Sequence, residues 1–162
     1  MKDGRELDLS AYWAAALAQR AGEMAAFFAP GAQVLWPNTN ERFTAEEFIR
    51  ANCEYPGAWE GEVERVEAMG PLLVTVVRVF DAGRTVSFHV TSFFRVEDGR
   101  IAALEEYWGD DGPPPAWRQA LGIGRPIRGG ARALHFSFSK WYSERRPFPL
   151  RAGLPVFGKE SF

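Results

Sequence analysis

The carboxylate of Glu106 is the side chain with the clearest capacity for chemistry, because it stands within a mostly apolar run at residues 101–108. A carboxylic acid among apolar neighbours keeps its proton to a higher pH, which brings it toward the range of a general acid or base. Alternation along the run places Glu106 on one face with Leu104 and Trp108 and leaves open whether this face is the inner one. The structural alternative is a carboxylate that bonds to the backbone or to an arginine and only helps to close the sheet.

His89 and Cys53 are two further candidates, for proton transfer and for nucleophilic attack. The run 85–94 alternates between two faces, and His89 shares its face with Thr85, Ser87 and Thr91. The opposite face carries the apolar side chains Val86, Phe88, Val90 and Phe94. We therefore expect His89 on the outer face of a sheet and no Ser-His-Asp triad. Cys53 is expected to pack at the end of a helix.

The sequence carries no pattern typical of a metal or cofactor site. It contains 2 His and 1 Cys, without an HExxH motif, so we expect no metal ion. The glycines at 122 and 124 are followed by Arg125 instead of the Lys-Ser/Thr pair of a phosphate-binding loop, so we expect no cofactor.

Length, composition and charge indicate one globular domain. The chain has 162 residues, of which 46% are hydrophobic and 14% aromatic, enough for a filled core or an aromatic cavity. No apolar run reaches the roughly 20 residues of a membrane helix, and the charged first ten residues do not resemble a signal peptide. We expect a cytoplasmic protein that does not bind membranes. Residues 1–127 carry 12 Lys/Arg and 19 Asp/Glu, and this acidic balance disfavours a nucleic-acid partner.

Hydrophobic periodicity and turn residues predict helices first and a run of strands afterwards. The expected elements are helices at 9–20 and 22–28, a helix that opens at Thr44, and strands at 33–36, 62–68, 72–80, 85–96 and 101–108. Pro30-Gly31 is expected to end the second helix. Short turns at 81–83 and 98–99 predict antiparallel pairing of the last three strands. This order indicates an α+β fold with helices on one face of a sheet.

Two segments resemble the NTF2-like superfamily and, within it, the SnoaL-like proteins. They are FFAPGAQVLWPNTNERFTAEEFIRANCEYPGAW at 27–59 and TVSFHVTSFFRVEDGRIAALEEYWGDDGPPPAWR at 85–118. The resemblance covers most of a domain that we place at residues 1–127. It implies a cone of strongly curved antiparallel sheet wrapped around N-terminal helices, with an interior pocket. The same fold hosts isomerases, cyclases, epoxide hydrolases and binding modules, so it does not by itself define the function.

A more distant similarity, to the limonene-1,2-epoxide hydrolases, implies roles for individual residues. Their acid before an aromatic pair corresponds to Glu106-Tyr107-Trp108, and their Tyr-x-Asn pair corresponds to Trp36-Pro37-Asn38. By this resemblance Glu106 and Asn38 are the catalytic candidates and hold a water molecule. The Arg-x-Asp pair of those enzymes falls on Leu73 and Thr75, so the acid that would protonate an epoxide is missing. We therefore expect no epoxide hydrolysis.

The resemblance also selects the inner face and leaves three functions open. It implies a pocket lined by Trp36, Phe88, Val90, Leu104 and Trp108. The first function is binding of a small apolar or amphipathic molecule. The second is an isomerase or cyclase that uses Glu106 as a general base, distantly similar to ketosteroid isomerase. The third is a protein-interaction module. The superfamily commonly dimerises through the outer sheet face, so we expect a homodimer.

Residues 128–162 extend beyond the resemblance. They carry 7 Lys/Arg and 2 Asp/Glu, three prolines and an aromatic stretch at 135–142. One interpretation is a mobile extension with some local packing. The other is an arm laid over the acidic body of the same or a partner subunit.

Overall fold

The structure is a computed structural model that describes residues 6–128. The expected basic extension therefore lies outside the described residues, apart from Arg128. Of these, residues 6–125 belong to one compact unit. Within the described range, no helix is long and apolar enough to cross a membrane.

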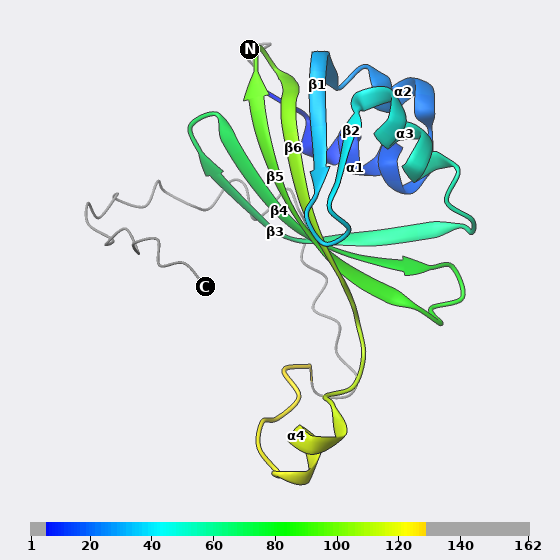
Figure 1. The fold of residues 1–162 in the computed structure, drawn as a ribbon, viewed down its shortest axis with the longest axis vertical. Helices are drawn as coiled ribbons and strands as arrows, with labels where there is room; N and C mark the ends of the chain where they lie inside the picture. Colours follow the sequence, from blue (N-terminus) through cyan, green and yellow to red (C-terminus); the bar gives the residue numbers. More distant parts are fainter. Residues whose placement is uncertain (1–5, 129–162) are drawn as a thin grey trace. The chain divides into compact units, whose positions relative to one another are not determined.

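The unit is built from helices and one curved six-stranded sheet that does not close (Figure 1). In chain order its elements are α1 (Leu9–Leu17), α2 (Ala21–Ala25), β1 (Phe28–Trp36), β2 (Glu41–Thr44), α3 (Ala45–Cys53), β3 (Trp59–Met69), β4 (Leu72–Asp81), β5 (Ser87–Glu97), β6 (Arg100–Asp110) and α4 (Ala116–Ala120). The strand order is β2-β1-β6-β5-β4-β3, and only the β1–β6 pair is parallel. The helices α1, α2 and α3 gather on one side of the sheet. The predicted α+β class is confirmed.

Turn chemistry explains the antiparallel meander of the last strands. Asp98 and Gly99 both have positive φ angles, 49° and 75°, which is the backbone of a two-residue hairpin turn with the twist of the flanking strands. At the preceding turn, the Asp81 carboxylate accepts hydrogen bonds from the backbone N–H groups of Thr85 and Val86 at 2.6 and 2.8 Å. The predicted pairing of the last three strands is confirmed.

The prediction for Pro30-Gly31 was wrong. These residues do not end a helix but lie inside β1, where the register to β6 shifts between Phe28 and Gln33. Proline has no N–H to give to a ladder and Gly31 has φ 76°, so both residues suit an irregular segment that pairs with nothing. Val86 was also expected to share the inner face with Phe88. This prediction was wrong, because Val86 precedes β5 and is 48% exposed.

The helices pack on the inner face of the sheet through aromatic contacts. Tyr12 of α1 meets Phe94 of β5 edge-to-face at 5.2 Å, and Phe48 of α3 meets Phe28 of β1 at 5.8 Å. On β3, a Cβ at Gly61 would stand 2.9 Å from the Cδ atoms of Leu17, so the glycine lets the Leu17 side chain of α1 come close to the sheet. The helix predicted to open at Thr44 is α3, and there Thr44 and Glu47 form a capping box.

Candidate functional site

Glu106 lies in the middle of β6 on the inner face and is 1% exposed. Three side chains donate hydrogen bonds to its carboxylate. The indole Nε1 atoms of Trp36 and Trp108 both donate to Oε2, at 3.0 and 3.2 Å, and Ser92 Oγ donates to Oε1 at 3.0 Å. The partners are therefore neither the backbone nor an arginine, the two that the structural alternative expected. Trp36 comes from β1 and Ser92 from β5, so this one carboxylate ties three strands together.

The environment of Glu106 changes its acidity. Burial raises the pKa of the Glu106 carboxyl above its usual value, although the hydrogen bonds from Trp36, Ser92 and Trp108 act in the opposite direction. The fully buried hydroxyl of Tyr12 also has a raised pKa, first because of its burial and second because of the charge of Glu106. The charged form of the Glu106 carboxylate is thus destabilised by burial and stabilised by three hydrogen-bond donors.

Thr75 continues the polar row to β4. It pairs in register with Ser92, which in turn pairs with Glu106. By the epoxide hydrolase resemblance, Thr75 occupies the place of the acid. Its hydroxyl is buried and has no hydrogen-bond partner among the described residues. An alcohol at this position has no acidic proton to give to an epoxide oxygen.

An apolar pocket of about 330 Å³ lies beside Glu106. Four of the predicted site residues line it, namely Trp36, Asn38, Phe88 and Trp108. Three others do not line it: Val90, Leu104 and Glu106 are buried in the sheet below. Asn38 Oδ1 accepts a hydrogen bond from the backbone N–H of Trp108 at 3.2 Å, which joins the end of β1 to β6 at the rim.

Sequence reasoning missed several pocket residues, which come from α1, α3, the turns that follow α1 and β1, and the strands β4 and β6. They are Trp13, Ala16, Leu17, Gln19, Thr39, Ala51, Val79 and Asp110. Gln19 makes contacts at the rim of the pocket that no sequence pattern predicts. Its Nε2 donates to the backbone oxygens of Asn52 and Tyr55, at 2.9 and 2.7 Å, and so connects the end of α1 to the segment after α3. Asn52, Tyr55 and Trp59 complete the lining.

The charged groups in and next to the pocket are acidic. Asp110 is the one charged side chain among the described residues that line it, and no lysine, arginine or histidine takes part. Behind the indoles of Trp36 and Trp108 stands a second carboxylate, that of Glu106. The pocket therefore offers aromatic surface and acidic groups and no cation for an acidic ligand.

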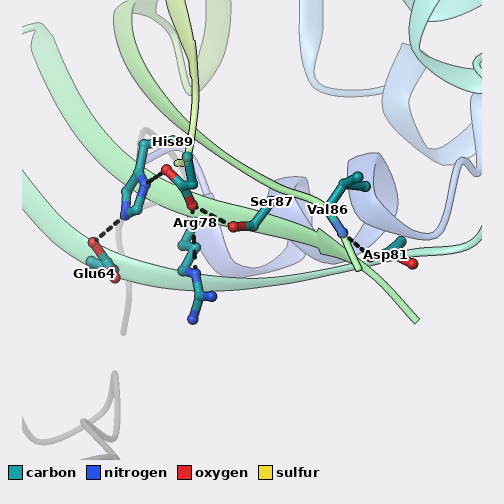
Figure 2. A network of polar contacts seen from close by, with 7 residues as sticks. Glu64, Arg78, Asp81, Val86, Ser87 and His89 are labelled. Atoms are coloured by element: carbon teal, nitrogen blue, oxygen red, sulfur yellow. Dashed lines mark hydrogen bonds and ion pairs between the residues drawn. The ribbon is translucent and has the colours of Figure 1, made fainter. Parts of the chain in front are cut away.

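A separate polar network surrounds His89 on the opposite face of β5 (Figure 2). His89 Nδ1 contacts the Asp111 carboxylate and His89 Nε2 lies 3.1 Å from Glu64 Oε2. Ser87 Oγ donates to Asp111 at 2.6 Å, and Arg78 Nε lies 3.7 Å from the same carboxylate. Because the serine bonds to the aspartate and not to the histidine, these groups are not arranged as a Ser-His-Asp triad. His89 does not line the apolar pocket.

The Asp111 carboxylate carries a testable pH dependence. Its partial burial raises its pKa, but the bonds from Ser87 and His89 and the charge of Arg78 outweigh this, so its pKa is lowered. Because its pKa is lowered, the ionised Asp111 stabilises the fold at pH values above the ordinary pKa of 3.8. This stabilisation is lost as the pH falls through the folded-state pKa. We expect Asp111→Asn to cost about 1 kcal/mol at pH 7 and clearly less at pH 3, measured by urea unfolding. Asp110→Asn is the neighbouring control. If the loss of unfolding free energy in Asp111→Asn does not change with pH, the lowered pKa of Asp111 is contradicted.

Metal binding finds no support in the described part of the chain, residues 6–128. No group of three or more His, Cys, Asp or Glu side chains there is arranged to hold an ion. A second hollow of about 350 Å³ adjoins the His89 network and includes Arg78, Arg84 and Asp111. Its lining carries charges of both signs, whereas six of the side chains that line the apolar pocket are aromatic. The apolar pocket is therefore the candidate functional site.

Comparisons with known proteins agree with this architecture. The SnoaL-like domain model matches residues 9–104. A proposed ketosteroid isomerase from Kribbella flavida DSM 17836 is similar in structure, with a TM-score of 0.62 and 27% identity over 76% of this chain and 90% of that one. An LEH-like epoxide hydrolase from M. tuberculosis has a TM-score of 0.52 and 19% identity over 62% of this chain and 79% of that one.

A proposed SnoaL-like polyketide cyclase from Shewanella denitrificans OS-217 has a TM-score of 0.51 and 9% identity over 62% of this chain and 86% of that one. No curated protein matches the sequence. The structures named here share the NTF2-like fold, and they include isomerase, cyclase and hydrolase relatives. Since the family model spans more than half of the chain, the protein belongs to the SnoaL-like domain family.

Proposed function

We propose that this protein binds a small, mostly apolar molecule in the pocket between α1, α3 and the sheet. The observation that carries the proposal is the pocket itself, about 330 Å³ in volume and lined by aromatic side chains from α1, β1, β3, β5 and β6. Ligand pockets typically span about 300–1,000 Å³, so this one suits a compact molecule. A module that only binds other proteins through its surface needs no such interior space, and the pocket thus favours a small-molecule function.

Assembly and location are further parts of the proposal. A homodimer through the outer sheet face is supported by apolar side chains that remain accessible there, such as Tyr107, which is 43% exposed and packs edge-to-face on Phe93 at 6.1 Å. Large exposed aromatic groups on one face are common at protein interfaces. A cytoplasmic location is consistent with a single cysteine, which forms no disulfide within the chain.

An isomerase or cyclase that uses Glu106 as a general base is the second candidate. The raised pKa of this buried carboxyl favours it, since a base of higher pKa removes a proton next to a carbonyl more readily. Glu106 does not line the pocket, so one of the two indoles above it must move before the carboxylate touches a substrate. If the protein is an enzyme, Glu106→Gln should bind a Δ5-3-ketosteroid as the native protein does and lose all of its isomerisation.

Titration with N-phenyl-1-naphthylamine tests the binding function. This neutral, apolar fluorophore brightens when it enters an apolar site. We expect saturable binding with one probe per chain and a concurrent change in tryptophan fluorescence, because four of the six tryptophans line the pocket. A linear, unsaturable rise in probe fluorescence with no change in tryptophan emission would overturn the proposal.

A further inference from the structure

The charges around the pocket disfavour an acidic ligand. Its described lining residues include no lysine, arginine or histidine, and the one charged member, Asp110, is an acid. Glu106 adds a second carboxylate directly behind the wall. An anion transferred from water into such a site loses its hydration and gains no partner of opposite charge. The site therefore accepts a neutral or a positively charged group.

Aromatic side chains make up much of the wall of the pocket. Six lining residues are aromatic: Trp13, Trp36, Tyr55, Trp59, Phe88 and Trp108. Five of them form two groups of contacting rings. Trp36 lies 6.4 Å from Trp108, and Trp59 lies 5.8 Å from Phe88 and 5.4 Å from Tyr55. The face of an aromatic ring carries a negative potential and attracts a cation, most strongly for tryptophan.

The hydrogen bonds to Glu106 add to this preference. The indole N–H groups of Trp36 and Trp108 both point to the same carboxylate, at 3.0 and 3.2 Å. Because these donors are already occupied, they are not free to bind a carbonyl or hydroxyl oxygen of a ligand. A donor that bonds to a carboxylate is also polarised by it, which moves electron density toward the ring. The rings of both tryptophans, which line the pocket, are thus electron-rich.

We propose that the ligand carries a compact ammonium group, tertiary or quaternary, which lies against the indole faces of Trp36 and Trp108, with Asp110 contributing negative charge from the lining. This inference rests on the small-molecule function proposed above and names its ligand class. The methyl or alkyl groups of such a cation fill apolar space, while its charge is stabilised by the rings and the carboxylates.

Three probes of one shape and different charge test the inference: choline, 3,3-dimethylbutan-1-ol and 3,3-dimethylbutanoate. Their affinities are measured by displacement of N-phenyl-1-naphthylamine from the full-length protein. We expect choline to bind at least about tenfold more tightly than the neutral alcohol, and the anion to bind most weakly. If the fluorophore binds but choline and the alcohol displace it with equal affinities, the cation preference is overturned and the proposed binding function is not. Failure of the fluorophore itself to bind would overturn both proposals.

Two variants locate the effect. Trp108→Phe keeps an aromatic ring but removes the indole and its bond to Glu106, so the preference for choline over the alcohol should fall several-fold. Trp117→Phe is the matched control, because Trp117 is 66% exposed and does not line the pocket. If Trp108→Phe weakens both probes equally, the indole acts only as a wall, and the inference is wrong. If both variants keep the full preference, the cation lies elsewhere, and the inference is again wrong.

Discussion

Replacing Glu106 with alanine is expected to lower the free energy of unfolding by about 3–5 kcal/mol. The change leaves a cavity in the sheet and removes the acceptor of three donors, Trp36 Nε1, Trp108 Nε1 and Ser92 Oγ. Buried donors without partners cost more than the hydrogen bonds themselves contribute. The measurement is urea unfolding at pH 7. A loss below about 1 kcal/mol would show that the carboxylate does not hold the three strands together.

Glu106→Gln is the matched control for this prediction. Glutamine has nearly the same shape, and its amide oxygen accepts both indole N–H groups while its NH₂ bonds to Ser92. Since the folded-state pKa of Glu106 is raised, the native protein has its full stability from this group below the ordinary value of 4.5 and loses part of it as pH rises through the folded-state pKa. The glutamine variant should therefore gain stability relative to the native protein between pH 4 and pH 8. A constant difference would contradict the raised pKa.

Filling the pocket is expected to abolish probe binding and leave the fold intact. Ala51 lies on α3, lines the pocket and is only partly buried, so a phenylalanine there extends into the free volume. We expect Ala51→Phe to weaken binding of N-phenyl-1-naphthylamine by about tenfold or more, with a change in unfolding free energy below about 1 kcal/mol. The measurement is fluorescence titration with parallel urea unfolding.

Val86→Phe is the control for the filled pocket. Val86 is 48% exposed and does not line the aromatic pocket, so the same added ring should leave probe affinity unchanged. Undiminished binding by Ala51→Phe would show that the fluorophore binds elsewhere, for example on the exposed outer sheet face. Equal losses in both variants would point to the same conclusion.

The sequence predicts the antiparallel part of the fold well and the parallel part poorly. The turn at Asp98-Gly99 is a local signal, since both residues tolerate positive φ, and it specifies the β5–β6 hairpin without any distant contact. The parallel pairing of β1 with β6 joins segments about 70 positions apart and has no such signal. The irregular stretch around Pro30 also hides the start of β1, because proline and glycine usually mark the end of an element.

The sequence also predicts some features of the candidate site and not others. Alternation along β5 and β6 places Phe88, Glu106 and Trp108 on one face, and their placement there follows from period 2. That two indole N–H groups converge on one carboxylate depends on side-chain directions across β1 and β6, which no local pattern encodes. The contributions of Trp13 and Ala51 depend on how α1 and α3 pack on the sheet, and this too is a tertiary property.

The most direct test of the binding function is a ¹H–¹⁵N spectrum of the tryptophan indole groups during titration with N-phenyl-1-naphthylamine. Single Trp→Phe variants assign each indole N–H signal. We expect the signals of Trp36 and Trp108, whose rings line the pocket, to shift with the same saturation curve, while the signal of the exposed Trp117 stays in place. Movement of Trp117 with no shift at Trp36 or Trp108 would show that the apolar pocket is not where the ligand binds.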